Sequence, residues 1–122
     1  MVEVSKNVNN ADLKKFREFI TKTISQFYIH KDFVRVGLMT YAAEPNGVVF
    51  LNAFKTQNQW PNVVNSLKLE GGTPDVVNAL TYLKAKMFSK FNGARENVPR
   101  EVFFLTSGKV PVDQIEQVGF AL

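Results

Sequence analysis

The chain contains no cysteine and only one histidine, His30. Without a thiol it can form no disulfide, no thiol nucleophile and no thiolate metal site. His30 stands in a polar Ile29-His30-Lys31-Asp32 connection, which is typical of a surface turn, so a Ser-His-Asp arrangement is not expected. The glycines match neither of the phosphate-binding patterns GxGxxG and GxxxxGK[ST]. The residues therefore do not predict an enzyme.

The sequence also lacks long apolar runs and clustered charge. No uncharged apolar run comes near the roughly 20 residues of a membrane-spanning helix. No basic and apolar signal peptide opens the chain, so a secretion signal would lie outside this segment. The net charge is +4, but the basic residues are scattered, and nucleic-acid binding is not expected. The 122 residues carry no repeat and no linker, and indicate one domain or part of one.

What the sequence does contain is an apolar fraction of 45%, with 11 Phe, 3 Tyr and 1 Trp, which suffices for a core. Its periodicity predicts helices that alternate with short strands, in the order of an α/β domain with helices covering a sheet. A loop of about six residues joins the first two strands into a hairpin. The predicted helices are Asp12 to Tyr28, Asn58 to Leu67, Pro74 to Phe91 and Val112 to Leu122, and the predicted strands are Phe33 to Tyr41, Val48 to Leu51 and Arg100 to Thr106.

The stretch Gly71-Gly72-Thr73-Pro74-Asp75 runs directly into the third predicted helix. Two interpretations are open for Thr73. Its hydroxyl can be the N-cap that accepts a backbone N–H of the first turn, with Pro74 at the first helical position and Asp75 near the positive end of the helix. Alternatively, the glycine loop presents that hydroxyl to a bound ion.

Several stretches, in the same order along the chain, resemble the von Willebrand factor type A domain. The resemblance covers nearly the whole sequence and is nearest to the A domains of collagen VI-type and matrilin-like matrix proteins. The stretches that carry it are Val34 to Tyr41 for VRVGxxxY, Phe50 to Phe54 for F-x-L-N-x-Y/F, Leu67 to Thr73 for L-x-x-x-G-G-T, Phe91 to Arg100 for F-x-x-x-x-G-x-R-x-x-V-P-K and Val102 to Gly108 for V-x-x-L-T-D-G.

The resemblance implies a Rossmann-like α/β fold, with a mostly parallel sheet flanked by helices, in a single partial domain over residues 1–122. In the family a hydrophobic first strand lies between the second and fourth strands, whereas only Met1 and Val2 precede Glu3 here. We therefore expect the first strand to be missing or vestigial and the last two strands to be missing. Either the chain is a fragment of a longer polypeptide or another segment fills the gap. Because unpaired strand edges promote association, we expect the isolated chain to be poorly soluble, oligomeric or partly folded.

The family's metal-ion-dependent adhesion site uses D-x-S-x-S, the Thr of GGT and the Asp of TDG. The resemblance places Glu3, Ser5 and Asn7 on the first motif and Thr73 on the second, while Ser107 stands in place of the last Asp. Glu3 is then the single carboxylate, whereas hard cations such as Mg²⁺ favour several oxygen ligands that include carboxylates. We therefore expect the metal site to be degenerate and to bind no cation, and we expect no cofactor. Thr73 is then expected to serve as the helix cap.

The resemblance implies a non-catalytic module for adhesion or protein–protein interaction, in a longer polypeptide secreted into the extracellular matrix or held at a cell surface. Its partners would be matrix proteins such as collagens, or other A domains. They would contact the loops at the carboxyl ends of the parallel strands, with Gly72, Asp75 and Lys109 at this edge. The alternative is an intracellular scaffolding module of the same family in a protein assembly, with which the lack of cysteine is compatible; the matrix-like segments favour the secreted form.

Overall fold

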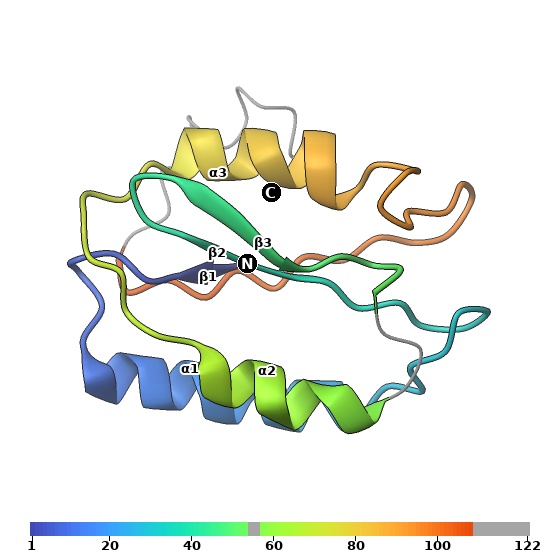
Figure 1. The fold of residues 1–122 in the computed structure, drawn as a ribbon, viewed down its shortest axis with the longest axis horizontal. Helices are drawn as coiled ribbons and strands as arrows, with labels where there is room; N and C mark the ends of the chain where they lie inside the picture. Colours follow the sequence, from blue (N-terminus) through green and yellow to red (C-terminus); the bar gives the residue numbers. More distant parts are fainter. Residues whose placement is uncertain (54–56, 109–122) are drawn as a thin grey trace.

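A small sheet lies between two layers of helices in the computed structural model, which describes residues 1–53 and 57–108 (Figure 1). Helices α1 (Asn10–Ile24) and α2 (Trp60–Ser66) cover one face, and α3 (Val76–Tyr82) covers the other. The α/β class expected from the order of elements is confirmed. The predicted helix from Val112 to Leu122 lies outside the described residues.

The first strand exists and is very short. β1 (Val2–Glu3) pairs in parallel with β2 (Leu38–Tyr41), with Val2 opposite Thr40. On its other side Val2 bridges Leu105 in parallel, and the N–H of Glu3 donates to the carbonyl of Leu105 at 2.9 Å. β1 therefore lies between β2 and the chain at Leu105, as the resemblance implied, and it fills the expected gap over the length of two residues.

Two predicted strands are shorter than expected. The strand predicted from Phe33 to Tyr41 is regular only in β2, and the one predicted from Arg100 to Thr106 is reduced to the bridge at Leu105. A strand needs a neighbouring backbone along its length, because its N–H and C=O groups bond to another chain segment. β1 supplies that neighbour only along its own two residues. The two apolar runs on either side of β1 therefore have no strand between them beyond Met1 and form no regular hydrogen-bonded ladder there.

The hairpin is tighter than predicted. β3 (Pro45–Val49) pairs antiparallel with β2 and begins before the predicted Val48, so the loop is shorter than six residues. Gly47 lies opposite Met39 in this pair. A Cβ at Gly47 would stand 2.7 Å from the Tyr82 hydroxyl, so only glycine lets the strand approach α3 this closely.

Helix α1 begins with a capping box. The Asn9 side chain accepts the N–H of Asp12 at 2.8 Å, and the Asp12 carboxylate accepts the N–H of Asn9 at 3.2 Å. The helix ends at Ile24, short of the predicted Tyr28. With the short helix η1 (Gln57–Gln59) and α2, it encloses an apolar cluster whose buried members are Val2, Val4, Leu13, Ile20, Ile24, Ile29, Leu38, Ala42, Val49, Trp60, Val64 and Leu67.

The helix on the other face changes its winding. α3 continues into a π-helical turn, η2 (Leu83–Met87), in which the N–H of Phe88 bonds to the carbonyl of Leu83 at 3.0 Å. The helix predicted from Pro74 to about Phe91 is therefore present but shorter, from Val76 to Met87, and its last turn is π-helical. Its buried residues pack with Met1, Met39 and Tyr41 in a second apolar cluster, to which it contributes Ala79, Leu80, Leu83 and Met87. None of the helices described here is long and apolar enough to cross a membrane.

Candidate functional site

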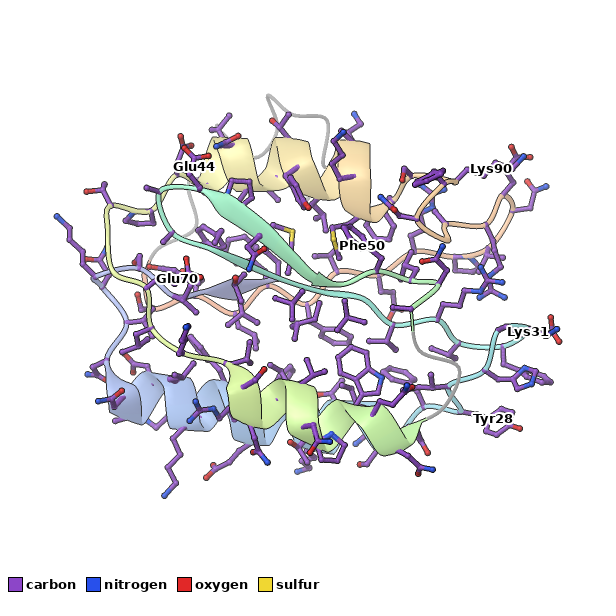
Figure 2. All side chains as sticks on the ribbon, viewed as in Figure 1. Tyr28, Lys31, Glu44, Phe50, Glu70 and Lys90 are labelled. Carbon is purple, nitrogen blue, oxygen red and sulfur yellow. The ribbon has the colours of Figure 1, made fainter. Side chains whose placement is uncertain are left out.

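Three loops meet at the carboxyl ends of β1 and β2, and we call them the loop edge: residues 4–7, 70–75 and 106–108. The end of the molecule that carries Glu44 and Glu70 lies opposite the end that carries Tyr28 and Lys31 (Figure 2). In parallel strands the carboxyl ends open onto one edge of the sheet, where bound partners are commonly found. The loop edge therefore has the position of a binding surface.

Backbone hydrogen bonds tie the first two loops together. The N–H groups of Glu70 and Gly71 both donate to the carbonyl of Val4, at 3.0 and 3.1 Å, and the N–H of Lys6 donates to the carbonyl of Gly72 at 2.9 Å. Gly71 and Gly72 have φ of +76° and +82°. Only glycine adopts such angles without strain, so this pair lets the loop fold back onto residues 4–6.

Glu3 is the charged centre beneath these loops, with 3% of its surface exposed. Its Oε1 accepts the Thr106 hydroxyl at 2.6 Å and the backbone N–H of Ser107 at 3.3 Å. Its Oε2 accepts the Ser5 hydroxyl and lies 3.4 Å from the Ser107 hydroxyl. A buried carboxylate is tolerated only when donors compensate its lost hydration, and these groups surround both oxygens.

Tyr41 completes the cluster. It lies opposite Glu3 in the β1–β2 register, and only 2% of its surface is exposed. Burial, and then the negative charge of Glu3, raise the pKa of Tyr41 to about 12. Neither Tyr41 nor Thr106 was among the predicted site residues. Tyr41 and Thr106 lie on either side of Glu3 in neighbouring parallel segments. Residues opposite each other in such segments share a face of the sheet, so the strand register would have identified both.

The structure brings together some of the predicted site residues. Glu3, Ser5 and Ser107 share the cluster, while Asn7 joins it through its backbone N–H, which donates to the Ser5 hydroxyl at 3.1 Å. Thr73 is exposed on the neighbouring loop, and within the described part of the chain no hydrogen bond links it to the cluster. Gly72 and Asp75 are exposed at the same edge, and Lys109 lies outside the described residues.

The helix cap is Asp75, and the prediction of Thr73 as the cap is wrong. The Asp75 carboxylate accepts the N–H of Asn78 at 3.0 Å, and α3 begins at Val76. The N–H of Asp75 is in turn bonded to the carbonyl of Ala42 at 2.9 Å, which fixes the helix start against the end of β2. An anionic side chain at this position also interacts favourably with the positive end of the helix dipole.

The divalent cation that the resemblance implies would be held by oxygen atoms of the cluster around Glu3, which are already engaged in hydrogen bonds with one another. Among residues 1–53 and 57–108 no three His, Cys, Asp or Glu side chains form a group that could hold a metal ion. Glu3, the carboxylate of the cluster with Ser5, Thr106 and Ser107, already accepts hydrogen bonds at both oxygens. Mg²⁺ and Ca²⁺ take several oxygen ligands and favour carboxylates among them. The cluster has instead the composition of an internal hydrogen-bond network.

Comparison with known proteins gives one family. Residues 1–120 match the family model described as the von Willebrand factor type A domain. Mouse matrilin-2 is 32% identical over 97% of this chain, and the mouse collagen alpha-1(XX) chain is 28% identical over 89% of it. The aligned parts are 13% and 8% of those two proteins, so this chain spans a small fraction of the relatives it matches.

Solved structures give the same fold. Proximal thread matrix protein 1 from the mussel byssus superposes with a TM-score of 0.78 at 15% identity, over 96% of this chain and 33% of that one. A second structure of the same mussel protein, described with a zinc-occupied MIDAS motif, also gives a TM-score of 0.78, at 14% identity. At such identities the likeness concerns the fold alone.

Proposed function

Because this chain belongs to the von Willebrand factor type A domain family, we propose that it is a non-catalytic protein-binding module of an extracellular matrix or cell-surface protein. Its relatives include matrilin-2 and several collagen chains, which supports an extracellular location within a longer polypeptide. Matrix proteins, such as collagens or other A domains, are the partners this assignment favours.

The loop edge is the proposed contact surface, and its construction is the observation that carries the proposal. Backbone hydrogen bonds through Val4, Lys6 and Gly72 fasten the first two loops to each other, and the Glu3 carboxylate holds the third loop at Thr106 and Ser107. A surface held in its binding conformation loses less entropy on association. Thr73 and Asp75 are exposed there, and Lys109 follows the third loop in sequence.

We propose that recognition at this edge needs no cation. The hydroxyl groups of Ser5 and Thr106, with the N–H of Ser107, surround Glu3, and they use the carboxylate that would otherwise be the principal metal ligand. Glu3 would thus brace the loops from inside, while side chains above it contact the partner. A chelator distinguishes this proposal from metal-dependent adhesion, because it should leave partner binding unchanged here and abolish it there.

Binding rather than catalysis is supported by the position of the single histidine. His30 stacks on Tyr28, at the end of the molecule opposite the loop edge (Figure 2). Its Nδ1 accepts the N–H of Asp32 at 3.1 Å, which is the geometry of a turn. The imidazole of His30 therefore lies far from the hydroxyl groups of Ser5, Thr106 and Ser107, and the sequence contains no other histidine and no cysteine.

The proposal is tested by binding of the chain to immobilised collagens and to purified A domains, with Mg²⁺ and with EDTA. The informative variant is Thr73→Lys, which adds bulk and charge to the exposed loop edge. Its matched control is Thr21→Lys on the exposed side of α1. We expect EDTA to leave binding unchanged, Thr73→Lys to weaken it by about tenfold, the scale of a disrupted interface contact, and Thr21→Lys to have no effect.

Two results would contradict the proposal separately. Loss of binding in EDTA, with restoration by Mg²⁺, would show that a cation takes part and that Glu3 is a ligand. Equal effects of Thr73→Lys and Thr21→Lys would show that the partner does not contact the loop edge.

A further inference from the structure

Three aromatic side chains gather on the surface at the end of the molecule opposite the loop edge, and we call them the aromatic tip. The ring centroids of Tyr28, His30 and Phe33 lie between 5.2 and 5.8 Å apart. Tyr28 and Phe33 are 65% and 60% exposed, and Figure 2 shows Tyr28 at this end, near Lys31. Exposed apolar side chains that cluster in this way commonly mark a contact surface.

The loop that carries the aromatic tip has a fixed shape. The N–H of Phe33 donates to the carbonyl of His30 at 3.0 Å, and the N–H of Val34 donates to the carbonyl of Tyr28 at 3.2 Å. The three rings do not line the apolar space beside Met1, so a segment that fills this space does not cover them. A contact surface that is already ordered loses less entropy when a partner binds.

The aromatic tip carries an excess of positive charge. Arg35 and Arg95 both donate to the carbonyl of Lys31, at 2.8 and 3.4 Å, which gathers three cations beside the rings. The acid of this loop is Asp32, which lies 3.8 Å from His30. Because the guanidinium groups already donate to carbonyls, they contribute charge more than free donors for a sulfate or phosphate group. The tip therefore fits a protein surface that is apolar and bordered by carboxylates.

The loop edge of the same chain offers such a surface where two turns meet, and we call it the acidic corner: residues 42–45 and 72–75. The N–H of Asp75 donates to the carbonyl of Ala42 at 2.9 Å, which joins the two turns. The small and cyclic apolar residues that reach the surface here are Ala43, Pro45 and Pro74. Proline packs well on aromatic rings, as in the recognition of proline-rich segments.

Carboxylates border the acidic corner. The side chain of Asn78 donates to Glu44 at 3.3 Å and its backbone N–H donates to Asp75 at 3.0 Å, so these two exposed acids belong to one patch. Glu70 is a further exposed acid of the loop edge, at the same end of the molecule as Glu44 (Figure 2). Lys6 is the exposed base among the loop-edge residues that the structure describes. The corner is thus the counterpart of the aromatic tip in both charge and apolar character.

We propose that the aromatic tip of one copy of this chain docks on the acidic corner of a second copy. Rings would pack on prolines while cations face carboxylates. Because the two surfaces lie at opposite ends of the molecule, the contact is heterologous, and copies add head to tail without closing a symmetric dimer (Figure 2). The inference rests on the proposed function, since it names one partner of the loop edge: the far end of another A domain.

The first test is analytical ultracentrifugation of the 122-residue chain in EDTA, at concentrations up to about 1 mM, the effective concentration that a short linker gives two copies in one polypeptide. We expect the average mass to rise with concentration at low ionic strength, beyond that of a dimer. The mass should return to that of a monomer in about 0.5 M salt, because salt screens exposed charges.

Variants of the two surfaces locate the contact. Phe33→Glu damages the tip and Glu44→Lys damages the corner, and each should weaken association by about tenfold or more, as loss of a central interface residue does. The matched controls are Phe91→Glu and Glu18→Lys, since Phe91 is 91% exposed outside the tip and Glu18 is exposed on α1. We expect both controls to associate as the unchanged chain does. Circular dichroism shows whether all four variants are folded.

A mixture of the two damaged variants is the decisive measurement. The Phe33→Glu chain keeps its corner and the Glu44→Lys chain keeps its tip, so one intact pair of surfaces is available between them. We expect each variant alone to remain a monomer, whereas the mixture forms a complex of one copy of each and nothing larger. Only a head-to-tail contact has this property, because in a symmetric contact the same surface serves both copies.

Four outcomes would overturn the inference. These are a chain that stays monomeric throughout, association that Phe33→Glu and Phe91→Glu weaken equally, association that neither surface variant weakens, and a mixture that fails to form the complex. A chain that fails to self-associate but binds a collagen in a way that Thr73→Lys weakens would remove this inference and leave the proposed function. A chain that neither self-associates nor binds an A domain or a collagen would contradict both.

Discussion

Replacing Glu3 by Gln should destabilise the fold strongly, although the substitution preserves the shape of the side chain. Glu3 is 3% exposed, and its carboxylate accepts from two hydroxyls and the N–H of Ser107. Gln replaces one accepting oxygen with an NH₂ that faces donors. The hydroxyls of Ser5 and Thr106 can rotate away, but the N–H of Ser107 is fixed. Hydrogen bonds to a charged group contribute about 1.5–3 kcal/mol each, against about 1 for neutral pairs, so we expect a loss of about 3 kcal/mol.

Urea unfolding followed by circular dichroism measures this loss. At a slope of about 1–3 kcal/mol per molar urea, the midpoint should fall by about 1–3 M while the slope stays unchanged. The control is Glu70→Gln, because Glu70 is exposed and its side chain makes no hydrogen bond within the described part of the chain. Surface changes of this type alter stability by about 0.5 kcal/mol or less.

A small effect would refute the reasoning. If Glu3→Gln costs less than about 1 kcal/mol, or no more than Glu70→Gln, the desolvation of the buried carboxylate cancels its hydrogen bonds. Glu3 would then not brace the loop edge. A stabilising substitution would point instead to a carboxylate kept for a ligand.

Three further predictions concern the same region. Asp75→Ala should cost about 1 kcal/mol of stability in urea unfolding and Thr73→Ala only a few tenths, since Asp75 is the cap of α3; the opposite ranking would restore Thr73 as the cap. The pKa of Tyr41 is about 12 in the folded chain, against an ordinary value of about 10, so between these pH values the Tyr41 hydroxyl is ionised in the unfolded chain and protonated in the folded one. This contribution to the free energy of unfolding should be fully present below pH 10 and decline by roughly 2–3 kcal/mol towards pH 12. Tyr41→Phe should remove this part of the alkaline decline, and an unchanged decline would contradict the shift. Millimolar Mg²⁺ or Mn²⁺ should not raise the melting temperature, whereas a rise that EDTA reverses would show a functional metal site.

Structural features that depend on residues close together in the sequence could be predicted from it. The capping box at Asn9 and Asp12 and the apolar stripe of α1 arise within a few turns of chain, where side-chain spacing alone sets which groups meet. The glycine pair at Gly71 and Gly72 likewise indicated a loop before the third predicted helix, and both residues have positive φ. The ordered motifs gave the family, which the match over residues 1–120 confirms.

The composition of the candidate site was only partly predictable. Glu3, Ser5 and Ser107 were predicted from the motifs, but Tyr41 and Thr106 enter the cluster through strand register, which no local pattern states. The cap at Asp75 depends on its bond to Ala42, a residue from a different loop. Sequence reasoning chose Thr73 because it weighed only the residues beside the helix.

By itself, therefore, the sequence determined the order of helices and strands, the glycine loop, the scarcity of carboxylates at the site and the family. The tertiary structure alone decided how long each strand is, which residues surround Glu3 and where the sheet is left open. The physical reason is the range of the interactions involved. Helices and caps close their hydrogen bonds within a few residues, whereas a strand such as the predicted Arg100 to Thr106 exists only where another segment lies alongside it, and here β1 does so for two residues.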